Sequence, residues 1–249
     1  MQPTKLRGII PPMITPLKGD DELDREGAVR LTEHLVAGGV HAIFLLGTTG
    51  EAQSLTYRLR YEFVELVCRQ VAGRVPVLVG VTDTAFIESI RLAEHAAKCG
   101  AVGVVAAPPY YFAPSQQELI EYYTALADAL PLPLYLYNMP SHVKVFLEPA
   151  TVKTLASHPN IVGLKDSSAN MTYFQTLLYH LGDNPDFSLY VGPEELTGEC
   201  VLLGADGGVN GGANIFPELY VAMYDAACAH DIARAVSYTH LRAHETKAN

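Results

Sequence analysis

Two hydrophobic patterns alternate along this chain. Short apolar runs rich in β-branched residues are separated by longer stretches in which apolar residues recur every three or four positions, which are the spacings of buried strands and amphipathic helices. We predict eight strands, over residues 8–14, 42–46, 77–81, 103–107, 134–137, 161–165, 188–192 and 206–210. We predict eight helices that alternate with them, over residues 25–37, 56–71, 85–98, 115–129, 148–157, 171–181, 194–203 and 217–229.

This strict alternation predicts an α/β fold with a parallel sheet. The runs VPVLVGV (75–81) and GVVAAP (103–108) are almost continuously apolar, as is typical of parallel strands that are covered on both faces. Eight strand–helix units in about 230 residues match a closed (β/α)8 TIM barrel. A doubly wound open sheet would place a glycine-rich phosphate loop after its first strand, whereas PPMITP (11–16) follows here. We therefore predict the barrel.

Composition narrows the class of protein. The 249 residues are 49% hydrophobic and 18% charged, which indicates a well-cored globular protein, and at this length one large domain is as plausible as two. The net charge is −10 without a Lys/Arg cluster, so we expect no nucleic-acid partner. No apolar run approaches the roughly 18 residues of a membrane span, and the start, MQPTKLRG, lacks the apolar stretch of a signal peptide. We expect a cytoplasmic protein that does not bind membranes.

The end of the chain has a different character. We predict that residues 1–235 form the barrel and that residues 236–249 are an atypical polar tail outside the fold. His240 and His244 stand four positions apart, but the glutamate of the metalloprotease motif is absent between them, so we expect no metal site. The four cysteines contain no CxxC pair, which indicates free thiols.

Barrel enzymes carry their chemistry at the carboxyl ends of the strands. Lys165 is the only lysine that ends an apolar strand, in the run IVGLK. Burial favours the neutral form of an amine, which can attack a ketone and form a Schiff base. A structural lysine that pairs with a carboxylate such as Asp166 explains the position equally well.

Two further strand ends carry candidate chemistry. Tyr137 ends the neighbouring strand and could transfer protons, although a buried tyrosine also packs and hydrogen-bonds without such a role. GTTGE (47–51) could present hydroxyls and backbone N–H groups to an anion such as a carboxylate, or could simply be a tight turn. The glycine-rich stretch 207–214 could hold a phosphate.

Four motifs stand at these strand ends in a fixed order: GTTGE (47–51), PPYY (108–111), YNMP (137–140) and GLKDSS (163–168). Together they resemble the dihydrodipicolinate synthase / N-acetylneuraminate lyase family, over about residues 6–229. The resemblance implies a class I aldolase or lyase that cleaves or forms a carbon–carbon bond between pyruvate, or another 2-oxo acid, and an aldehyde. It further implies catalysis without a metal or organic cofactor, in a homo-oligomer (dimer or tetramer).

The resemblance also assigns roles to single residues. It implies that Lys165 forms the Schiff base, that Tyr137 shuttles protons, and that Thr48 and Thr49 bind the 2-oxo acid carboxylate. It implies a proton relay through Thr49 and Tyr111, with the tyrosine contributed by a neighbouring subunit. The substrate-binding positions that it adds are His142, Gly192, Glu194, Glu195 and Val209.

Departures from the family pattern bear on the substrate. Dihydrodipicolinate synthases place an arginine where His142 stands, and an imidazole cannot form a bidentate fork with a substrate carboxylate. Glu194 and Glu195 resemble the acidic pair that holds sugar hydroxyls in sialic acid lyases, although GTTGE has a threonine where those enzymes have serine. We therefore expect a 2-oxo acid substrate, with 2-keto-3-deoxy sugar acids and sialic-acid-like compounds as candidates.

Other functions stay open at this point. The first alternative is a 4-hydroxy-tetrahydrodipicolinate synthase, which condenses pyruvate with aspartate semialdehyde. The second is a barrel that binds a 2-oxo acid without catalysis. The third is a metal-dependent aldolase or phosphate-handling barrel, for which His142 is the only well-placed histidine. Because the family's C-terminal helical region is expected to be missing, we also predict weakened stability or assembly with the catalytic residues intact.

Overall fold

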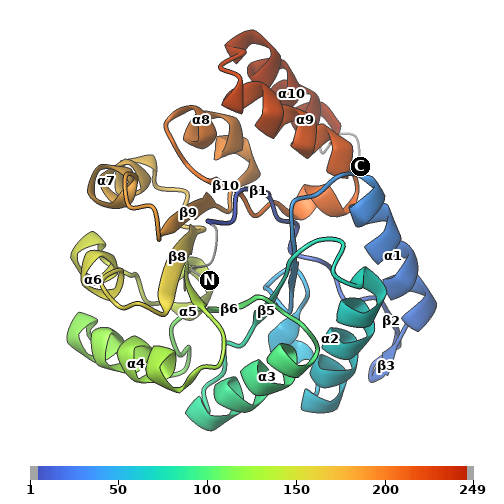
Figure 1. Cartoon of the computed structure of the whole chain (residues 1–249), viewed down its shortest axis with the longest axis vertical. Coiled ribbons are helices and arrows are strands. Elements are labelled where there is room, and N and C mark those ends of the chain that lie inside the picture. The colour runs from blue at the N-terminus through green and yellow to red at the C-terminus, as the bar shows by residue number, and fades with distance from the viewer. Residues whose placement is uncertain (1–4, 246–249) are drawn as a thin grey trace.

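The barrel predicted from the sequence is present. The computed structural model describes residues 5–245, with the side chains of residues 5–239, and it places eight parallel strands inside a ring of helices (Figure 1). Around the barrel the strands follow the order β1-β10-β9-β8-β7-β6-β5-β4. They are β1 (Gly8–Ile9), β4 (Ile43–Leu45), β5 (Val77–Gly80), β6 (Gly103–Ala106), β7 (Leu134–Asn138), β8 (Ile161–Asp166), β9 (Ser188–Val191) and β10 (Gly207–Gly208).

The ring closes between β4 and the segment that follows β1. Pro12 pairs with Phe44 in a parallel bridge. On either side of it the Phe44 N–H donates to Pro11 O at 3.0 Å, and the Met13 N–H donates to Phe44 O at 2.8 Å. Together with the pairing of Gly8 to Gly207 across β1 and β10, these bonds complete a closed barrel.

The helices also agree with the predicted periodicity, and each lies against the outside of the strands (Figure 1). Local signals fix where they begin: Ser115 and Glu118 form a capping box at the start of α4, and proline opens α6 and α9. The predicted helices are α1 (Arg25–Ala37), α2 (Tyr57–Val71), α3 (Phe86–Lys98), α4 (Gln116–Ala129), α6 (Pro149–Leu155), α7 (Met171–Leu181), α8 (Thr197–Leu202) and α9 (Pro217–Cys228).

Several short elements were not predicted. They are the hairpin of β2 (Leu17–Gly19) and β3 (Glu22–Leu23), the one-turn helix α5 (Pro140–Val143), and the 3-10 turns η1 (Ala52–Ser54) and η3 (Gly211–Asn214). Each is too short to show a hydrophobic period. The helix predicted over residues 194–203 begins as a 3-10 turn, η2 (Glu194–Leu196), which leads into α8.

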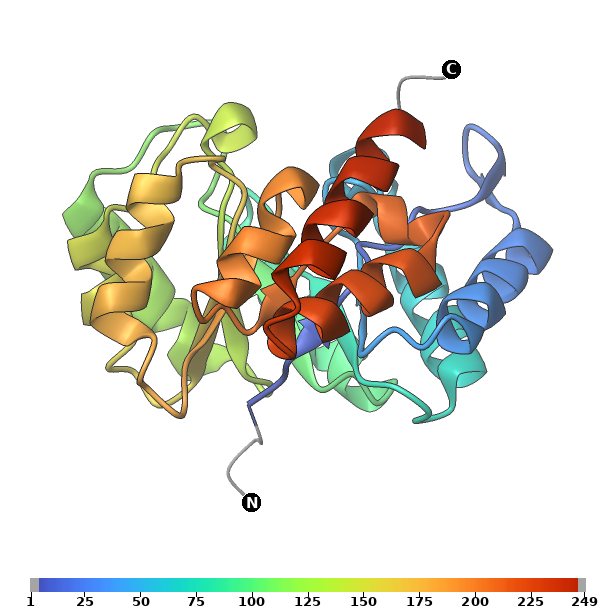
Figure 2. The same ribbon diagram turned by 90° about the horizontal axis from the view of Figure 1, so that it is seen from above.

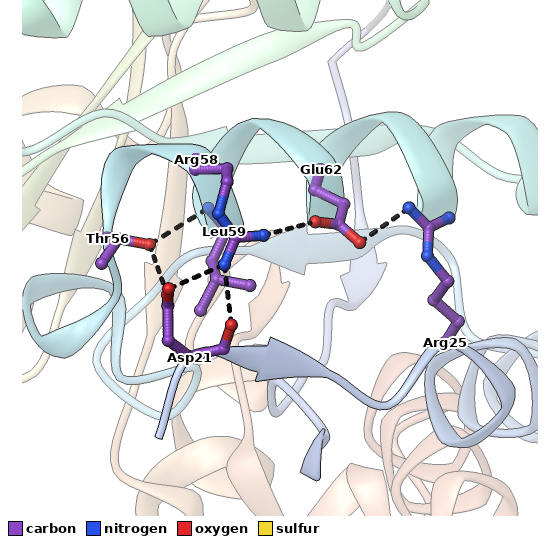
Figure 3. Close-up of polar contacts among 6 residues, drawn as sticks. All are labelled: Asp21, Arg25, Thr56, Arg58, Leu59 and Glu62. Carbon is purple, nitrogen blue, oxygen red and sulfur yellow. Dashed lines mark hydrogen bonds and ion pairs between the residues drawn. The ribbon is translucent and has the colours of Figure 1, made fainter. Parts of the chain in front are cut away.

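The hairpin is held against the start of α2 by a network of charged groups (Figure 3). Asp21 accepts from the Thr56 hydroxyl at 2.9 Å and from Arg58 Nη2 at 2.8 Å. Arg58 also donates to Glu62 at 3.1 Å, and Glu62 pairs with Arg25 at 2.7 Å. Because Thr56 is the N-cap of α2, the hairpin and the first turns of this helix are fixed together.

The chain ends in a tenth helix, α10 (Ile232–Glu245), which lies beside α9 on the outside of the barrel (Figure 2). Ala235 is buried there, and Tyr238 packs on the apolar residues of α8 and α9. The sequence predicted a polar tail from residue 236 on, whereas the helix is continuous through that point because these two residues give it an apolar face. The position of the domain limit stays a prediction.

Membrane-spanning helices and metal-binding clusters can be assessed for the described residues. Among residues 5–245, every helix is too short or too polar to span a bilayer. In the same part of the chain, no three or more His, Cys, Asp or Glu side chains come together as metal ligands. His240 and His244 lie outside the side chains that the structure describes.

Candidate active site at the barrel mouth

Lys165 is held inside the barrel by β8. All six residues of this strand are buried, and the lysine side chain is only 7% exposed. Its Nζ lies 4.4 Å from the centre of the Tyr137 ring and 5.4 Å from that of Phe44. Among the described side chains, no carboxylate lies within ion-pair distance of this amine. Lys165 is therefore surrounded by aromatic rings rather than paired with an acid.

The carboxylate next to Lys165 in sequence is used elsewhere. Asp166 accepts from the Asn138 side chain at 2.8 Å, and from the N–H and hydroxyl of Ser168 at 3.0 and 2.9 Å. Burial raises the pKa of the Asp166 carboxyl, and these hydrogen bonds partly offset the rise. Asp166 thus holds the ends of β7 and β8 together, and the interpretation of Lys165 as its ion-pair partner is wrong.

Tyr137 stands directly opposite Lys165 in the register of β7 and β8. Its hydroxyl lies 3.3 Å from Thr48 Oγ1. Burial raises the pKa of the Tyr137 phenol, but the charge of Lys165 and hydrogen bonding to Thr48 and Ser167 outweigh it, so the pKa is lower than that of an ordinary tyrosine. Such a phenol releases its proton more readily, which suits a proton shuttle.

The loop after β4 offers donors for an anion. Leu46 and Glu51, at its two ends, have φ of 57° and 53°, a left-handed conformation that is strained for these side chains. The turn uses the N–H of Glu51, which donates to Thr48 O at 3.0 Å. In the described structure the N–H groups of Thr48 and Thr49 donate to no protein acceptor. Two amides and the Thr48 hydroxyl can therefore serve a carboxylate.

A cavity of about 350 Å³ opens above these groups at the carboxyl ends of the strands. A second space of about 10 Å³ shares Phe44 and Val105 with it and is also lined by Lys165 and Val209. Among the residues that the structure describes, no lysine or arginine lines the larger cavity. Its polar and aromatic lining consists of Phe44, Thr48, Glu51, Gln53, Ser54, Thr82, Tyr110, Tyr137 and His142.

The structure brings together only part of the residue set expected from the sequence. Thr48, Tyr137 and His142 line the larger cavity, and Lys165 and Val209 line the smaller space.

The remaining expected residues lie outside these spaces. Thr49 is exposed, and the Tyr111 ring is 81% exposed and packs edge-to-face on Phe112. Glu195 is exposed on η2.

Glu194 and Gly192 make contacts within the loops. Glu194 accepts from the Gly212 N–H at 2.6 Å and from the Tyr220 hydroxyl, so its carboxylate fixes the η3 turn. The Gly192 N–H donates to Asp166 O at 2.7 Å, which extends the pairing of β9 with β8.

Sequence reasoning missed several residues of the cavity wall. Gln53 and Ser54 lie in η1, just after GTTGE, and Thr82 follows β5. The strand-end rule alone could have found Thr82, because it directly follows the strand predicted over residues 77–81. Tyr110 lines the cavity although its neighbour Tyr111 was the residue singled out.

Comparison with known proteins gives a consistent result. The family model described as Dihydrodipicolinate synthetase family matches residues 5–244. A solved structure titled dihydrodipicolinate synthase, from Bacteroides thetaiotaomicron, is 59% identical with a TM-score of 0.92 and covers 94% of this chain and 79% of that one. The 4-hydroxy-tetrahydrodipicolinate synthase of Thermus thermophilus is 39% identical over 243 residues, which are 96% of this chain and 80% of the relative.

Aldolases also match. The putative 2-dehydro-3-deoxy-D-gluconate aldolase YagE of Escherichia coli is 36% identical over 233 residues, which are 93% of this chain and 77% of the relative. A crystal structure of YagE in complex with pyruvate has a TM-score of 0.90, with 94% of this chain and 79% of that chain covered.

Proposed function

The chain belongs to the dihydrodipicolinate synthetase family, and from that premise we propose how its barrel mouth works. It is a lyase of the class I aldolase type, which forms or breaks a carbon–carbon bond between pyruvate and an aldehyde through a Schiff base. The reaction needs no external cofactor, because the imine itself withdraws electrons. The roles of single residues below are proposals.

Lys165 attacks the ketone carbon of the 2-oxo acid. Loss of the ketone oxygen as water leaves an iminium, which accepts the electrons of the bond between the carbons α and β to it. The carboxylate of the substrate is held by the amides of Thr48 and Thr49, which have no protein acceptor, and by the Thr48 hydroxyl. This placement sets the ketone next to the buried amine.

Tyr137 moves the proton of the bond-breaking step. In the cleavage direction the deprotonated Tyr137 oxygen takes the proton of the substrate hydroxyl, the carbon–carbon bond breaks and the aldehyde leaves, and the electrons of that bond remain in an enamine of pyruvate. Protonation and hydrolysis of the enamine release pyruvate and free Lys165. In the synthetic direction the same enamine attacks an aldehyde. The lowered pKa of Tyr137 and its contact with Thr48 support this role.

Tyr111 is proposed to complete a relay with Thr49 from a second copy of the chain. Its ring is 81% exposed at the barrel mouth and is therefore available to another subunit. Assembly as a homodimer or tetramer, like the cytoplasmic location, stays a prediction.

The residues that line the cavity indicate which aldehyde the site binds. Aspartate semialdehyde has a carboxylate, for which an arginine or lysine is the usual partner. The cavity has neither, and His142 is an exposed side chain that hydrogen-bonds to the Ser141 hydroxyl at 3.0 Å. The lining instead offers neutral hydrogen-bonding groups, including Gln53, Ser54 and Thr82. We therefore propose a 2-keto-3-deoxy sugar acid, whose hydroxyls such groups can bind.

The second candidate is 4-hydroxy-tetrahydrodipicolinate synthase. It is favoured by the 59% identity to the Bacteroides thetaiotaomicron structure that bears the name dihydrodipicolinate synthase. In that case protonated His142 would be the cation that meets the second carboxylate.

The first experiment traps the imine. The protein is incubated with pyruvate and borohydride, and its peptides are analysed by mass spectrometry. We expect a reduced pyruvyl adduct on Lys165 and none in Lys165→Ala. Absence of an adduct on folded protein would refute the Schiff-base mechanism and leave a binding barrel or a metal-dependent enzyme.

The second experiment identifies the partner of pyruvate. Cleavage of 2-keto-3-deoxygluconate is compared with the condensation of pyruvate and aspartate semialdehyde, by kcat/KM. A higher value for the sugar acid supports the proposed substrate class, and a higher value for aspartate semialdehyde supports the second candidate.

A further inference from the structure

One wall of the cavity is built by chain segments that follow three different strands. Gln53 and Ser54 come from the loop after β4, Thr82 from the loop after β5, and Ala107 from the end of β6. The Ala107 N–H donates to Thr82 Oγ1 at 2.9 Å, which ties the second segment to the third. The segment that contains Gln53 and Ser54 must be held by another connection, because η1 is a single turn without a side-chain cap.

Arg60 supplies that connection from α2. Its Nε donates to the carbonyl oxygen of Leu55 at 3.2 Å, and its Nη1 donates to Asp83 Oδ2 at 3.1 Å. Leu55 directly follows Ser54, and Asp83 directly follows Thr82. One guanidinium therefore bonds to the residue behind each of the two wall segments.

The connection is buried and its polar atoms are satisfied. Arg60 is 7% exposed and Asp83 is 5% exposed. The Tyr57 hydroxyl donates to Asp83 Oδ2 at 3.1 Å, and the Tyr57 ring lies 4.8 Å from the guanidinium carbon. Asp83 Oδ1 accepts from the Ala85 N–H at 2.9 Å, where α3 begins. The N–H donors of a guanidinium form a rigid, planar fork, so a buried arginine fixes the relative positions of the acceptors to which it bonds.

We propose that Arg60 is a positioning residue for the aldehyde-binding part of the cavity. It acts through Leu55 and Asp83, and it sets the distance between the Gln53–Ser54 wall segment and Thr82. Lys165 and Tyr137 lie on β7 and β8, on the other side of β6 from β5, and among the described residues Arg60 makes its hydrogen bonds to neither of them. Thr48 and Thr49 share the segment after β4 with Gln53 and Ser54, but Arg60 bonds to Leu55 beyond η1 and not to that turn. This inference rests on the proposed function only for the identity of the second substrate.

The chain provides a matched control on the same helix. Arg58 also makes ion pairs, but with groups that do not line the cavity: it bonds to Asp21 in the turn of the hairpin and to Glu62 on α2 (Figure 3). Its side chain is 57% exposed. Replacing either arginine by lysine keeps the charge and removes the fork, so the pair Arg60→Lys and Arg58→Lys separates cavity positioning from the general effect of losing an arginine on α2.

The kinetic test measures both halves of the reaction. For condensation of pyruvate with D-glyceraldehyde, we expect Arg60→Lys to raise the KM for the aldehyde about tenfold. A small displacement of the groups that position a substrate is sufficient to produce an effect of this size. The rate of borohydride trapping with pyruvate alone should stay within about twofold of wild type. Arg58→Lys should change neither value. Tyr57→Phe, which removes only one hydrogen bond to Asp83, should raise the KM for the aldehyde in the same direction by a smaller factor.

The structural test does not depend on activity. Hydrogen–deuterium exchange should become faster in peptides covering residues 51–57 and 81–86 of Arg60→Lys, and should stay unchanged in β7 and β8. Unchanged exchange in those two peptides would overturn the inference. So would an unchanged KM in a variant that turns over D-glyceraldehyde, or imine trapping that slows as much as the aldehyde step. If wild-type protein traps pyruvate but rejects D-glyceraldehyde, the proposed substrate class fails while the exchange test still decides the role of Arg60.

Discussion

Replacing Tyr137 by phenylalanine separates catalysis from folding more cleanly than any other single change at this site. The substitution keeps the ring that packs 4.4 Å from Lys165 Nζ, and it removes only the hydroxyl, which lies 3.3 Å from Thr48 Oγ1. The hydroxyl hydrogen-bonds to Thr48 and Ser167, and two lost hydrogen bonds cost about 2 kcal/mol. For a chain of this length that corresponds to a fall in Tm of about 4–8 °C, so the variant stays folded at assay temperature.

The loss of rate should be much larger than the loss of stability. Removing a general acid–base group slows a reaction by about 10²–10⁴. At about 1.4 kcal/mol for each factor of ten, that is about 3–5 kcal/mol of transition-state stabilisation. The pKa of Tyr137 is lowered from the usual 10.0, so the wild-type kcat for cleavage should rise with pH and level off below that value. The phenylalanine variant should lack this rise.

The assay follows pyruvate released from 2-keto-3-deoxygluconate between about pH 6 and about pH 10, a range that spans the titration of the phenol. Thermal unfolding of both proteins checks that they are folded. Thr48→Val is the control, because it removes the partner of the phenol and keeps the phenol itself, and it should cost less than Tyr137→Phe. A kcat for Tyr137→Phe within about threefold of wild type, or an unchanged pH profile, would refute the role of the hydroxyl as a proton shuttle.

Two further predictions concern the frame around the site. Asn138→Ala removes the buried amide that donates to Asp166 and accepts from the Leu147 N–H. Asp166 keeps its bonds to Ser168 and loses one hydrogen bond, about 1 kcal/mol, whereas the buried Leu147 N–H is left without a partner, which costs about 1–3 kcal/mol. Tm should therefore fall by about 5–15 °C in thermal unfolding, and a fall under about 2 °C would contradict this. Burial lowers the pKa of His41, whose neutral Nδ1 accepts from the Ile9 N–H at 3.1 Å. The stability that neutral His41 contributes is therefore complete above about pH 6.5, and it is lost as the pH falls through the lower pKa that His41 has in the folded state. The urea midpoint should therefore drop more on acidification in wild type than in His41→Asn, and equal drops would exclude His41 as the cause.

Hydrophobic periodicity was sufficient for the main elements of the fold. Strands such as β5 and β6 are apolar along their whole length, and α7 begins and ends at the predicted residues, because its apolar residues repeat at helical spacing and Asn170 caps its start. The β2–β3 hairpin could not be found in this way, because its strands contain three and two residues that are mostly exposed. Their position depends on Asp21 and its partners on α2, which are distant in sequence.

The chemistry of the site was only partly readable. Lys165 and Tyr137 were found because each ends a strand that points into the barrel mouth, and the register then places them side by side. The position of Glu194 was not readable, since its contacts with Gly212 and Tyr220 form between loops that only the folded chain brings together. Arg60 was missed for the same reason: a lone arginine within a helical pattern looks like a surface residue until Asp83 is packed against it.

The closure of the barrel has a consequence for the chain during its synthesis on the ribosome. β1 lies between β4 and β10, so the first strand made is paired on one side with the last, and Ile14 donates to Asn214 across 200 residues of sequence. Until β10 has been made, the growing sheet has open edges, and such edges readily pair with other chains. Nascent or truncated chains that lack β10 should therefore aggregate, and chains long enough to include it should not. The barrel is thus protected from edge-to-edge aggregation only late in synthesis, and the protection appears within a few residues of chain length.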